Sequence, residues 1–327
     1  MTTRADDTTY AQRPPAPLPG TGRRVLRVVA VAATVPYLAL KTAWLAGSQI
    51  GIPAGSVLSE PGLFYTVANA VTLAMDACVI LLVLVLTTPW GIRVPAWLLT
   101  VPVFVATGLL TPILIGFSGQ LLIRALGFGA DPAGSSGQEP FLDPWVFHVV
   151  YAGFSVQGLA LAGLFVPYAR ERWGRRWQGV LGERLPSSTG VMAAAAAVTG
   201  AAVGAVYLYW AFGGTAGLAE ARVEQWSAET GVVSAAHGLC ALAAGAGAVL
   251  LARGGARRAW WPAALAWTGS AATVSWALWM LIASAGGELE TVKEAHAVMY
   301  LPYAGQMITG LLSAAVLTRF LTARRSA

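Results

Sequence analysis

The sequence predicts an all-α integral membrane protein, a polytopic bundle of eight transmembrane helices built as two parallel four-helix repeats. Three observations lead to this prediction. The 327-residue chain is 56% hydrophobic and only 11% charged, with a mean hydropathy of +0.63, whereas soluble proteins carry about 25% charged residues. The apolar residues fall into blocks long enough to cross a bilayer, about 20 residues each. Short motifs recur in the same order in the two halves of the chain.

This composition excludes a cytosolic enzyme, a secreted disulfide scaffold and a nucleic-acid-binding domain. The net charge of +6 looks basic, but the arginines are confined to particular loops, which indicates orientation in a membrane and no nucleic-acid partner. Cys78 and Cys240 lie in separate apolar blocks, so neither a disulfide framework nor a zinc framework is expected.

Each apolar block exceeds the roughly 17 residues that a spanning helix needs. The blocks are continuously apolar and do not alternate with polar residues, which favours helices over the strands of a membrane barrel. We expect helices over residues 25–46, 64–89, 94–117, 144–168, 189–213, 231–252, 259–285 and 296–321.

The loops orient these helices. If the N-terminus is cytoplasmic, the inner segments contain 17 of the 21 lysines and arginines, and the outer loops contain most of the acidic residues. Arg124 and Glu229 are both assigned to outer loops. This distribution follows the positive-inside rule, so both termini are expected in the cytoplasm. Arginine far outnumbers lysine, and alanine and glycine are abundant, as in high-GC bacteria. The expected location is therefore the bacterial plasma membrane.

Two motifs indicate an internal duplication. The pattern W-x-x-G-x-x-x-G begins at Trp44 and again at Trp210, an offset of 166, and Y-A-G-x4-G-L-x2-A begins at Tyr151 and again at Tyr303, an offset of 152. An even number of helices in each half makes the repeats parallel. The chain then divides into a disordered tail at 1–22, a first repeat at 23–168, a basic cytoplasmic linker at 169–188 and a second repeat at 189–327.

The segment from Tyr207 to Leu218, which reads YLYWAFGGTAGL, resembles the first-helix signature of small four-helix membrane proteins of unknown function in actinobacteria. Those proteins are about the size of one half of this chain, so the resemblance implies a fused pair. It covers about a dozen residues and implies no activity. In the first half, Lys41 stands where the second half has Tyr207.

Two charged residues lie well inside predicted helices, away from the helix ends: Lys41 in the first and Asp76 in the second. A charge within a bilayer costs free energy and usually has a function. On the repeat alignment their equivalents, Tyr207 and Ala243, are uncharged, so only the first half carries this pair. We expect Asp76 to be a coupling or counter-ion residue and Lys41 its modulator. The alternative is a structural Asp76, hydrogen-bonded to a Ser, Thr or Asn side chain of a neighbouring helix, and an ion pair with Lys41 is left open.

The three histidines, His148, His237 and His296, are all predicted near the outer face. Three imidazoles with neighbouring carboxylates suit a zinc, copper or haem site. Their spacing matches no known motif, however, and histidines are common at membrane interfaces. No other cofactor is expected.

Small residues four apart recur in the fourth and eighth predicted helices, where they predict close helix packing: Gly158, Ala162, Gly310 and Ala314. The string Gly116-Phe-Ser-Gly119 matches the G-x-S-G of intramembrane serine proteases, but a glycine-rich helix end at the outer surface is the favoured explanation.

The leading hypothesis is a secondary carrier or permeation pathway for a small solute, with a site between the halves near mid-membrane. One alternative is a non-catalytic membrane subunit for assembly or signalling. The other is an outer-face, metal-dependent membrane enzyme. The expected partners are the lipid bilayer, anionic lipid headgroups at the arginine-rich cytoplasmic loops, and either another protein or a second copy of this chain.

Overall fold

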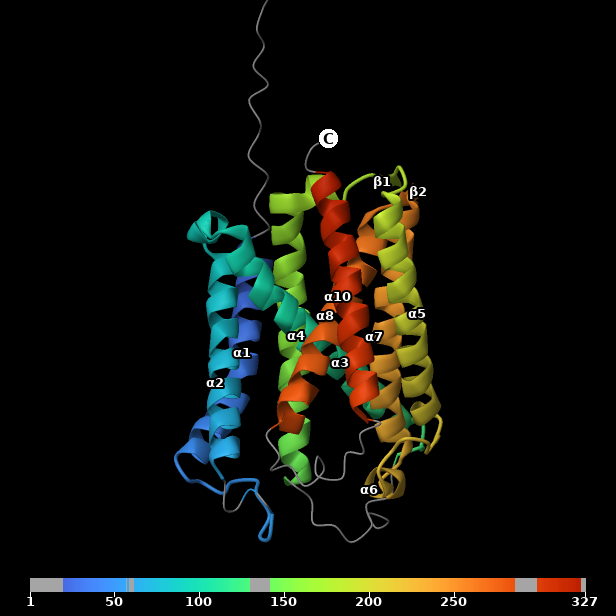
Figure 1. Cartoon of the computed structure of the whole chain (residues 1–327). Helices are drawn as coiled ribbons and strands as arrows, with labels where there is room; N and C mark the ends of the chain where they lie inside the picture. Colours follow the sequence, from blue (N-terminus) through green and yellow to red (C-terminus); the bar gives the residue numbers. More distant parts are fainter. Residues whose placement is uncertain (1–19, 57, 59–61, 130–141, 286–298, 325–327) are drawn as a thin grey trace, which may run out of the picture.

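The fold is an all-α polytopic bundle, as the sequence predicts. The computed structural model describes the chain except for residues 1–19, 57, 59–61, 130–141, 286–298 and 325–327. Within the described residues, eight helices are long and apolar enough to cross a membrane. They run up and down in one bundle, with their connections at its two ends (Figure 1). The chain is therefore a multi-pass integral membrane protein.

The eight spanning helices match the eight predicted blocks. They are α1 (Gly20–Leu45), α2 (Leu63–Thr87), α3 (Ala96–Ala125), α4 (Pro144–Trp173), α5 (Ser187–Ala211), α7 (Ala228–Arg253), α8 (Trp260–Ala285) and α10 (Tyr300–Ala323). Shorter elements lie at the ends of the bundle: η1 (Pro89–Arg93), η2 (Gly174–Arg176), α6 (Glu220–Glu224), β1 (Val180–Gly182) and β2 (Gly255–Arg258). The two strands pair antiparallel.

Helix α3 is longer than predicted. It continues eight residues past the expected end at 117, so the string Gly116 to Gly119 lies inside the helix and not at its terminus. A Cβ built on Gly119 would collide with Val232 of α7, whereas one on Gly116 would make an ordinary contact with Val233, so Gly119 allows α3 to pack closely on α7. Helix packing therefore accounts for this string.

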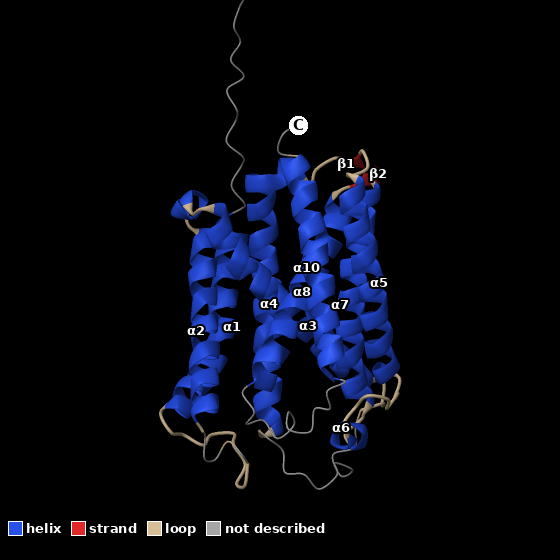
Figure 2. Ribbon diagram, in the orientation of Figure 1, coloured by secondary structure: helices blue, strands red, loops and turns tan. Residues whose placement is uncertain are grey.

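One end of the bundle is strongly basic. The first residues of α1, the last residues of α10 and the paired strands β1 and β2 all lie at this end, which is uppermost in Figures 1 and 2. We call it the basic end. Among the described residues, its acidic side chains are Glu171 and Glu183. Its basic side chains are Arg23, Arg24, Arg27, Arg93, Arg170, Arg172, Arg175, Arg176, Arg184, Arg253, Arg257, Arg258, Arg319 and Arg324. The positive-inside rule predicts that this end faces the cytoplasm.

The same pairs of helices meet in the two halves of the chain. In the second half α5 packs on α7 and α10, and α8 packs on α7 and α10. In the first half α1 packs on α2 and α4, and α3 packs on α4 and, slightly, on α2. The halves differ in one respect, because α3 leans out of the first half and packs on α7 and α8. This helix therefore forms the main contact between the halves.

The tryptophan–glycine motif has the same local structure in both halves. The indole Nε1 of Trp44 donates to the carbonyl oxygen of Ile50 at 2.8 Å, and that of Trp210 donates to the carbonyl oxygen of Ala216 at 3.0 Å. The motif glycines have left-handed backbones, which favour glycine: Gly47 (φ +86°), Gly51 (φ +72°), Gly213 (φ +86°) and Gly217 (φ +81°). This agreement supports the predicted duplication, which stays a prediction.

Glycines allow close backbone contacts between helices. A Cβ built on Gly108 of α3 would collide with the carbonyl oxygen of Ala271 in α8, and one on Gly269 of α8 would collide with the backbone nitrogen of Ala244 in α7. Small residues let membrane helices approach so that dispersion contacts accumulate. The interface of α3 with the second half therefore depends on Gly108.

The predicted packing residues differ in their surroundings. A Cβ on Gly158 would lie 3.5 Å from the Leu110 Cβ, and one on Gly310 would lie 3.0 Å from the Ser270 carbonyl oxygen, so both glycines occupy helix contacts within their own half. Ala162 is exposed on α4 and Ala314 is half-buried on α10. Of this set, only Gly310 thus lies at a point of close approach, since a Cβ on Gly158 would make an ordinary contact.

Replacing Gly108 by alanine should destabilise the bundle. The added methyl group overlaps the Ala271 backbone, and overpacking of this kind costs about 1–3 kcal/mol. The control is Gly190→Ala on α5, where nothing lies within 4 Å of the added carbon, so stability should stay unchanged or rise slightly. Thermal unfolding of the purified protein in detergent measures both variants, and equal melting temperatures would contradict this packing.

Candidate functional site

The intramembrane acid of the first half lies in the protein interior. Asp76 of α2 is 4% exposed, and Gln157 of α4 is 1% exposed. The Gln157 side-chain nitrogen Nε2 donates to Asp76 Oδ1 at 2.9 Å. Asp76 Oδ2 and Gln157 Oε1 are buried and have no hydrogen-bond partner within the described part of the chain. The carboxyl group is thus removed from both lipid and water and is supported by a single donor.

A tyrosine of α1 completes the surroundings of this acid. The side chain of Tyr37 lies near Thr72, one turn before Asp76 on α2, and near Asp76 itself. Helices α1, α2 and α4 therefore each contribute a polar side chain to one region inside the first half. We call Asp76, Gln157, Tyr37 and Thr72 the acid cluster.

Lys41 is not part of the acid cluster. Its Nζ donates to Asn69 Oδ1 at 2.6 Å and lies over the rings of Tyr37 and Trp44, 5.2 and 4.9 Å from their centroids. Asn69 is two helical turns from Asp76 along α2, so the structure separates the two ionisable residues. No cation pairs with Asp76 among the described residues.

The sequence predicts a site between the two halves, but the acid cluster does not lie there. Helix α2 packs on α1, α3 and α4, and it is α3 that reaches α7 and α8. Asp76 is consequently enclosed by its own half. The expectation is wrong because it assumes that the two repeats meet symmetrically, whereas one helix of the first half makes the main contact.

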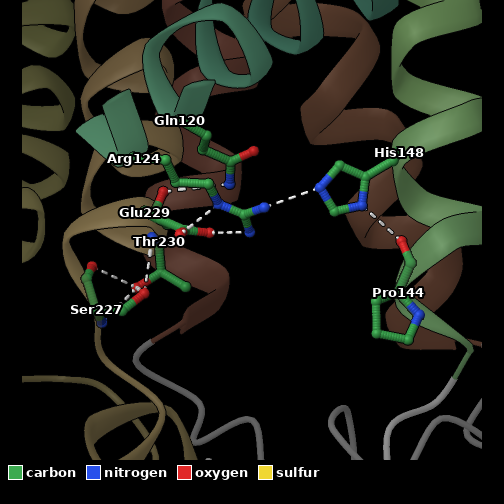
Figure 3. A network of polar contacts seen from close by, with 7 residues as sticks. All are labelled: Gln120, Arg124, Pro144, His148, Ser227, Glu229 and Thr230. Carbon is green, nitrogen blue, oxygen red and sulfur yellow. Dashed lines mark hydrogen bonds and ion pairs between the residues drawn. The ribbon is translucent and has the colours of Figure 1, made fainter. Parts of the chain in front are cut away.

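A second polar cluster joins the two halves of the chain at the end of the bundle opposite the basic end. Arg124 in the last turn of α3 forms two hydrogen bonds with Glu229 of α7, from Nε to Oε1 and from Nη2 to Oε2, both 2.6 Å. Its remaining nitrogen, Nη1, lies 2.8 Å from His148 Nε2 on α4. Figure 3 shows the guanidinium group extended between the carboxylate and the imidazole. Gln120 adds a hydrogen bond to the Glu229 backbone oxygen at 3.3 Å.

Local sequence positions the two charges of this bridge. Ser227 caps α7, because its Oγ accepts from the Thr230 backbone nitrogen at 3.2 Å while Thr230 Oγ1 accepts from the Ser227 nitrogen at 2.9 Å. Glu229 then lies in the first turn of α7 and Arg124 in the last turn of α3, the positions that a helix dipole favours for each charge. We call Arg124, Glu229 and His148 the arginine bridge.

The sequence analysis missed the arginine bridge because it assigned Arg124 and Glu229 to outer loops. The signal that was available is their placement at the ends of helices. An arginine that ends one helix and a glutamate that begins another carry complementary charges at the same membrane boundary.

The histidines are in different surroundings. Both ring nitrogens of His148 have neighbours, since Nδ1 lies 2.7 Å from the Pro144 carbonyl oxygen (Figure 3) and Nε2 faces Arg124. His237 packs against the rings of Tyr207 and Trp276, at centroid distances of 5.5 and 5.2 Å. His296 lies outside the described residues. Within those residues no group of three or more His, Cys, Asp or Glu side chains is placed to hold a metal ion.

Comparisons with protein-family models, with curated proteins and with solved structures found no match. What bears on function is therefore the geometry of the acid cluster and the arginine bridge. The fused-pair origin that the YLYWAFGGTAGL segment implies stays a prediction.

Proposed function

We propose that the protein is a proton-coupled secondary carrier for a small solute and that Asp76 binds the coupling proton. The observation that carries this proposal is a carboxyl group 4% exposed, with one hydrogen-bond donor and no paired cation in the described part of the chain. Acidic residues inside transmembrane segments are rare, and they mark proton relays and ion pathways.

Hydrogen bonding distinguishes the two protonation states of Asp76. A protonated carboxyl group and a primary amide can satisfy each other in a ring, the amide nitrogen donating to one carboxyl oxygen and the acid proton donating to the amide oxygen. Asp76 Oδ1 already accepts from Gln157, and the two atoms left over are an acid oxygen and an amide oxygen. Neither oxygen has a donor, and an acid proton on Asp76 supplies one, so the protonated form suits this packing.

Loss of the proton should therefore disturb the contact of α2 with α4. An unsatisfied buried acceptor costs about 1–3 kcal/mol, and more when it is charged. Water, a cation or a shift of the helices would lower the free-energy cost of the ionised Asp76. A packing equilibrium that depends on one proton is the element through which a carrier couples proton movement to a change of shape.

The arginine bridge supports the proposal from the other end of the molecule. Arg124 contacts α7 of the second half and α4 of the first half. A carrier must close one end of its pathway while the other opens, and a multivalent guanidinium group between the halves is suited to hold one end closed. The bridge is then a gate on the side that the positive-inside rule predicts to be extracellular.

Proteoliposomes that contain a pH-sensitive dye test the proposal. Amino acids, sugars, organic acids and organic cations are added singly at a fixed proton gradient, with protein-free vesicles as the control. We expect one solute class to accelerate proton movement in the presence of the protein. Solute uptake without proton movement, or no response to any of these classes, would contradict the proposal.

A non-catalytic membrane subunit is the second candidate, and the packing of the second half favours it. The helices α7 and α8 approach at backbone level at Gly269, and a Cβ on Gly247 of α7 would collide with the backbone of Ala266 in α8. Such packing leaves no room for a path between these two helices. A stoichiometric complex extracted from native membranes, combined with unchanged proton movement in the vesicle assay, would favour this candidate.

A further inference from the structure

A pocket at the basic end is built from both halves of the chain. It has a volume of about 490 Å³ and is lined by Arg170 of α4, Trp177 and its neighbours in the linker, Arg258 of β2 and Trp260 of α8. This volume lies in the range of about 300–1,000 Å³ that small-molecule sites occupy. The pocket is separate from the acid cluster and from the arginine bridge, whose residues do not line it.

Backbone pairing fixes the shape of this pocket. Strand β1 pairs with β2 through Val180 and Arg258, and the Ala259 nitrogen donates to the Gly179 carbonyl oxygen at 2.9 Å. The linker is thereby held against the start of α8. Arg324 adds hydrogen bonds to the linker carbonyl oxygens of Gln178, at 3.0 Å, and Val180. The lining residues therefore belong to a built structure.

The two arginines of the pocket are available for a ligand. Four other arginines of the basic end, Arg23, Arg172, Arg319 and Arg324, donate side-chain hydrogen bonds, whereas the rest have no side-chain partner within the described residues. The side chains of Arg170 and Arg258 have no hydrogen-bond or ion-pair partner within the described residues, and both residues are exposed. Guanidinium groups bind phosphate oxygens through paired, charge-assisted hydrogen bonds.

The two tryptophans supply the apolar part of the pocket. Trp177 is half-buried and Trp260 is 55% exposed, and Trp260 is the first residue of a spanning helix. Indole rings at this depth contact the region where lipid headgroups meet acyl chains. A site with two free cations beside two indoles at the membrane boundary suits an amphiphile, with a phosphate at one end and hydrocarbon at the other.

We propose that this pocket binds the phosphate of an anionic phospholipid of the adjoining leaflet, with Arg170 and Arg258 on the phosphate and Trp177 and Trp260 against the glycerol and upper acyl chains. The site joins the first half, through α4, to the second, through β2 and α8. Its occupant therefore holds the two halves together at the end opposite to the arginine bridge. This proposal does not depend on the role of Asp76.

Native mass spectrometry of the purified full chain in detergent tests the site by titration with phosphatidylglycerol, phosphatidylcholine or inorganic phosphate. The test variant is Arg170→Gln with Arg258→Gln. The control is Arg175→Gln with Arg257→Gln, which removes the same charge from exposed neighbours that do not line the pocket. We expect the control to retain phosphatidylglycerol and the test variant to bind it about tenfold or more weakly, from roughly 1 kcal/mol for each arginine.

Three results would overturn the proposal. The first is equal weakening in both double variants, which means diffuse attraction by the basic end. The second is equal binding of phosphatidylcholine, and the third is inorganic phosphate displacing the lipid at matched concentration, which makes free phosphate the ligand. If the test variant fails to fold, a photoactivatable phosphatidylglycerol is crosslinked to the unaltered protein. Labelling around Trp177 and Trp260 is then expected, and labelling elsewhere would refute the site.

Discussion

Replacing Asp76 by asparagine should abolish solute-driven proton movement and reduce it to the level of protein-free vesicles. Asparagine has the size of aspartate, and its side-chain oxygen can still accept the 2.9 Å hydrogen bond from Gln157. It has no acidic group that can bind and release a proton, however. The fold should therefore persist while coupling is lost, and the two effects are separated by thermal unfolding on one hand and by the dye-loaded vesicles on the other.

Two further variants serve as controls for this loss. Asp76→Glu keeps an acid that can bind a proton, so it should retain part of the activity. Lys41→Met removes the lysine of α1, but Lys41 bonds Asn69 and not Asp76, so proton coupling should survive. Activity in Asp76→Asn, or equal loss in Lys41→Met, would show that Asp76 has no special part in coupling.

The second large effect is expected at the arginine bridge. Arg124→Glu places a carboxylate against Glu229, whose side chain is 12% exposed, at an ion pair that measures 2.6 Å. Like charges at a desolvated contact cost several kcal/mol, and the 45% exposure of Arg124 moderates this by solvent screening. We expect a loss of about 2–3 kcal/mol in the free energy of unfolding.

The charge-swapped double variant makes this prediction specific. Arg124→Glu combined with Glu229→Arg restores opposite charges across α3 and α7, so most of the lost stability should return. The measurement is unfolding of the four proteins in the same detergent, analysed as a double-mutant cycle. Additive losses in the double variant would mean that the two residues stabilise the bundle separately and do not form a bridge.

The helices could be predicted from the sequence because the bilayer leaves few alternatives. A backbone in hydrocarbon must satisfy its own hydrogen bonds, so each long apolar block becomes a helix. The end of α3 was harder to place, because its last two turns contain Gln120 and Arg124, which resemble loop residues until their partners on α7 are known. Polar residues in a helix that ends at the membrane boundary hide that helix from a hydropathy pattern.

The acid cluster was predictable in part. Asp76 is evident as a charge in an apolar block, and the structural alternative expects a Ser, Thr or Asn partner on a neighbouring helix. The partner is Gln157, an uncharged residue that hydropathy does not single out. Its choice follows from the packing of α4 against α2, which depends on three-dimensional contacts among all four helices of the half. The packing of α3 on α7 and α8 also depends on contacts that the sequence does not reveal.

The pairing of β1 with β2 had no sequence signal. These strands have three and four residues and are separated by two spanning helices, so neither alternation nor a turn motif marks them. Their hydrogen bonds place the linker beside α8 and create the pocket of the basic end. A site that depends on such distant pairing becomes visible only in the folded chain.

The central claim is that Asp76 holds an exchangeable proton inside the bundle, and infrared spectroscopy of the protein in lipid nanodiscs tests it directly, without a known solute. The difference between the wild-type protein and Asp76→Asn is recorded as pH is raised. We predict a protonated-carboxyl carbonyl band that only the wild-type protein shows, that disappears as the proton is lost and that is accompanied by changes in the amide bands. A carboxylate band at every pH at which the protein stays folded would contradict the account.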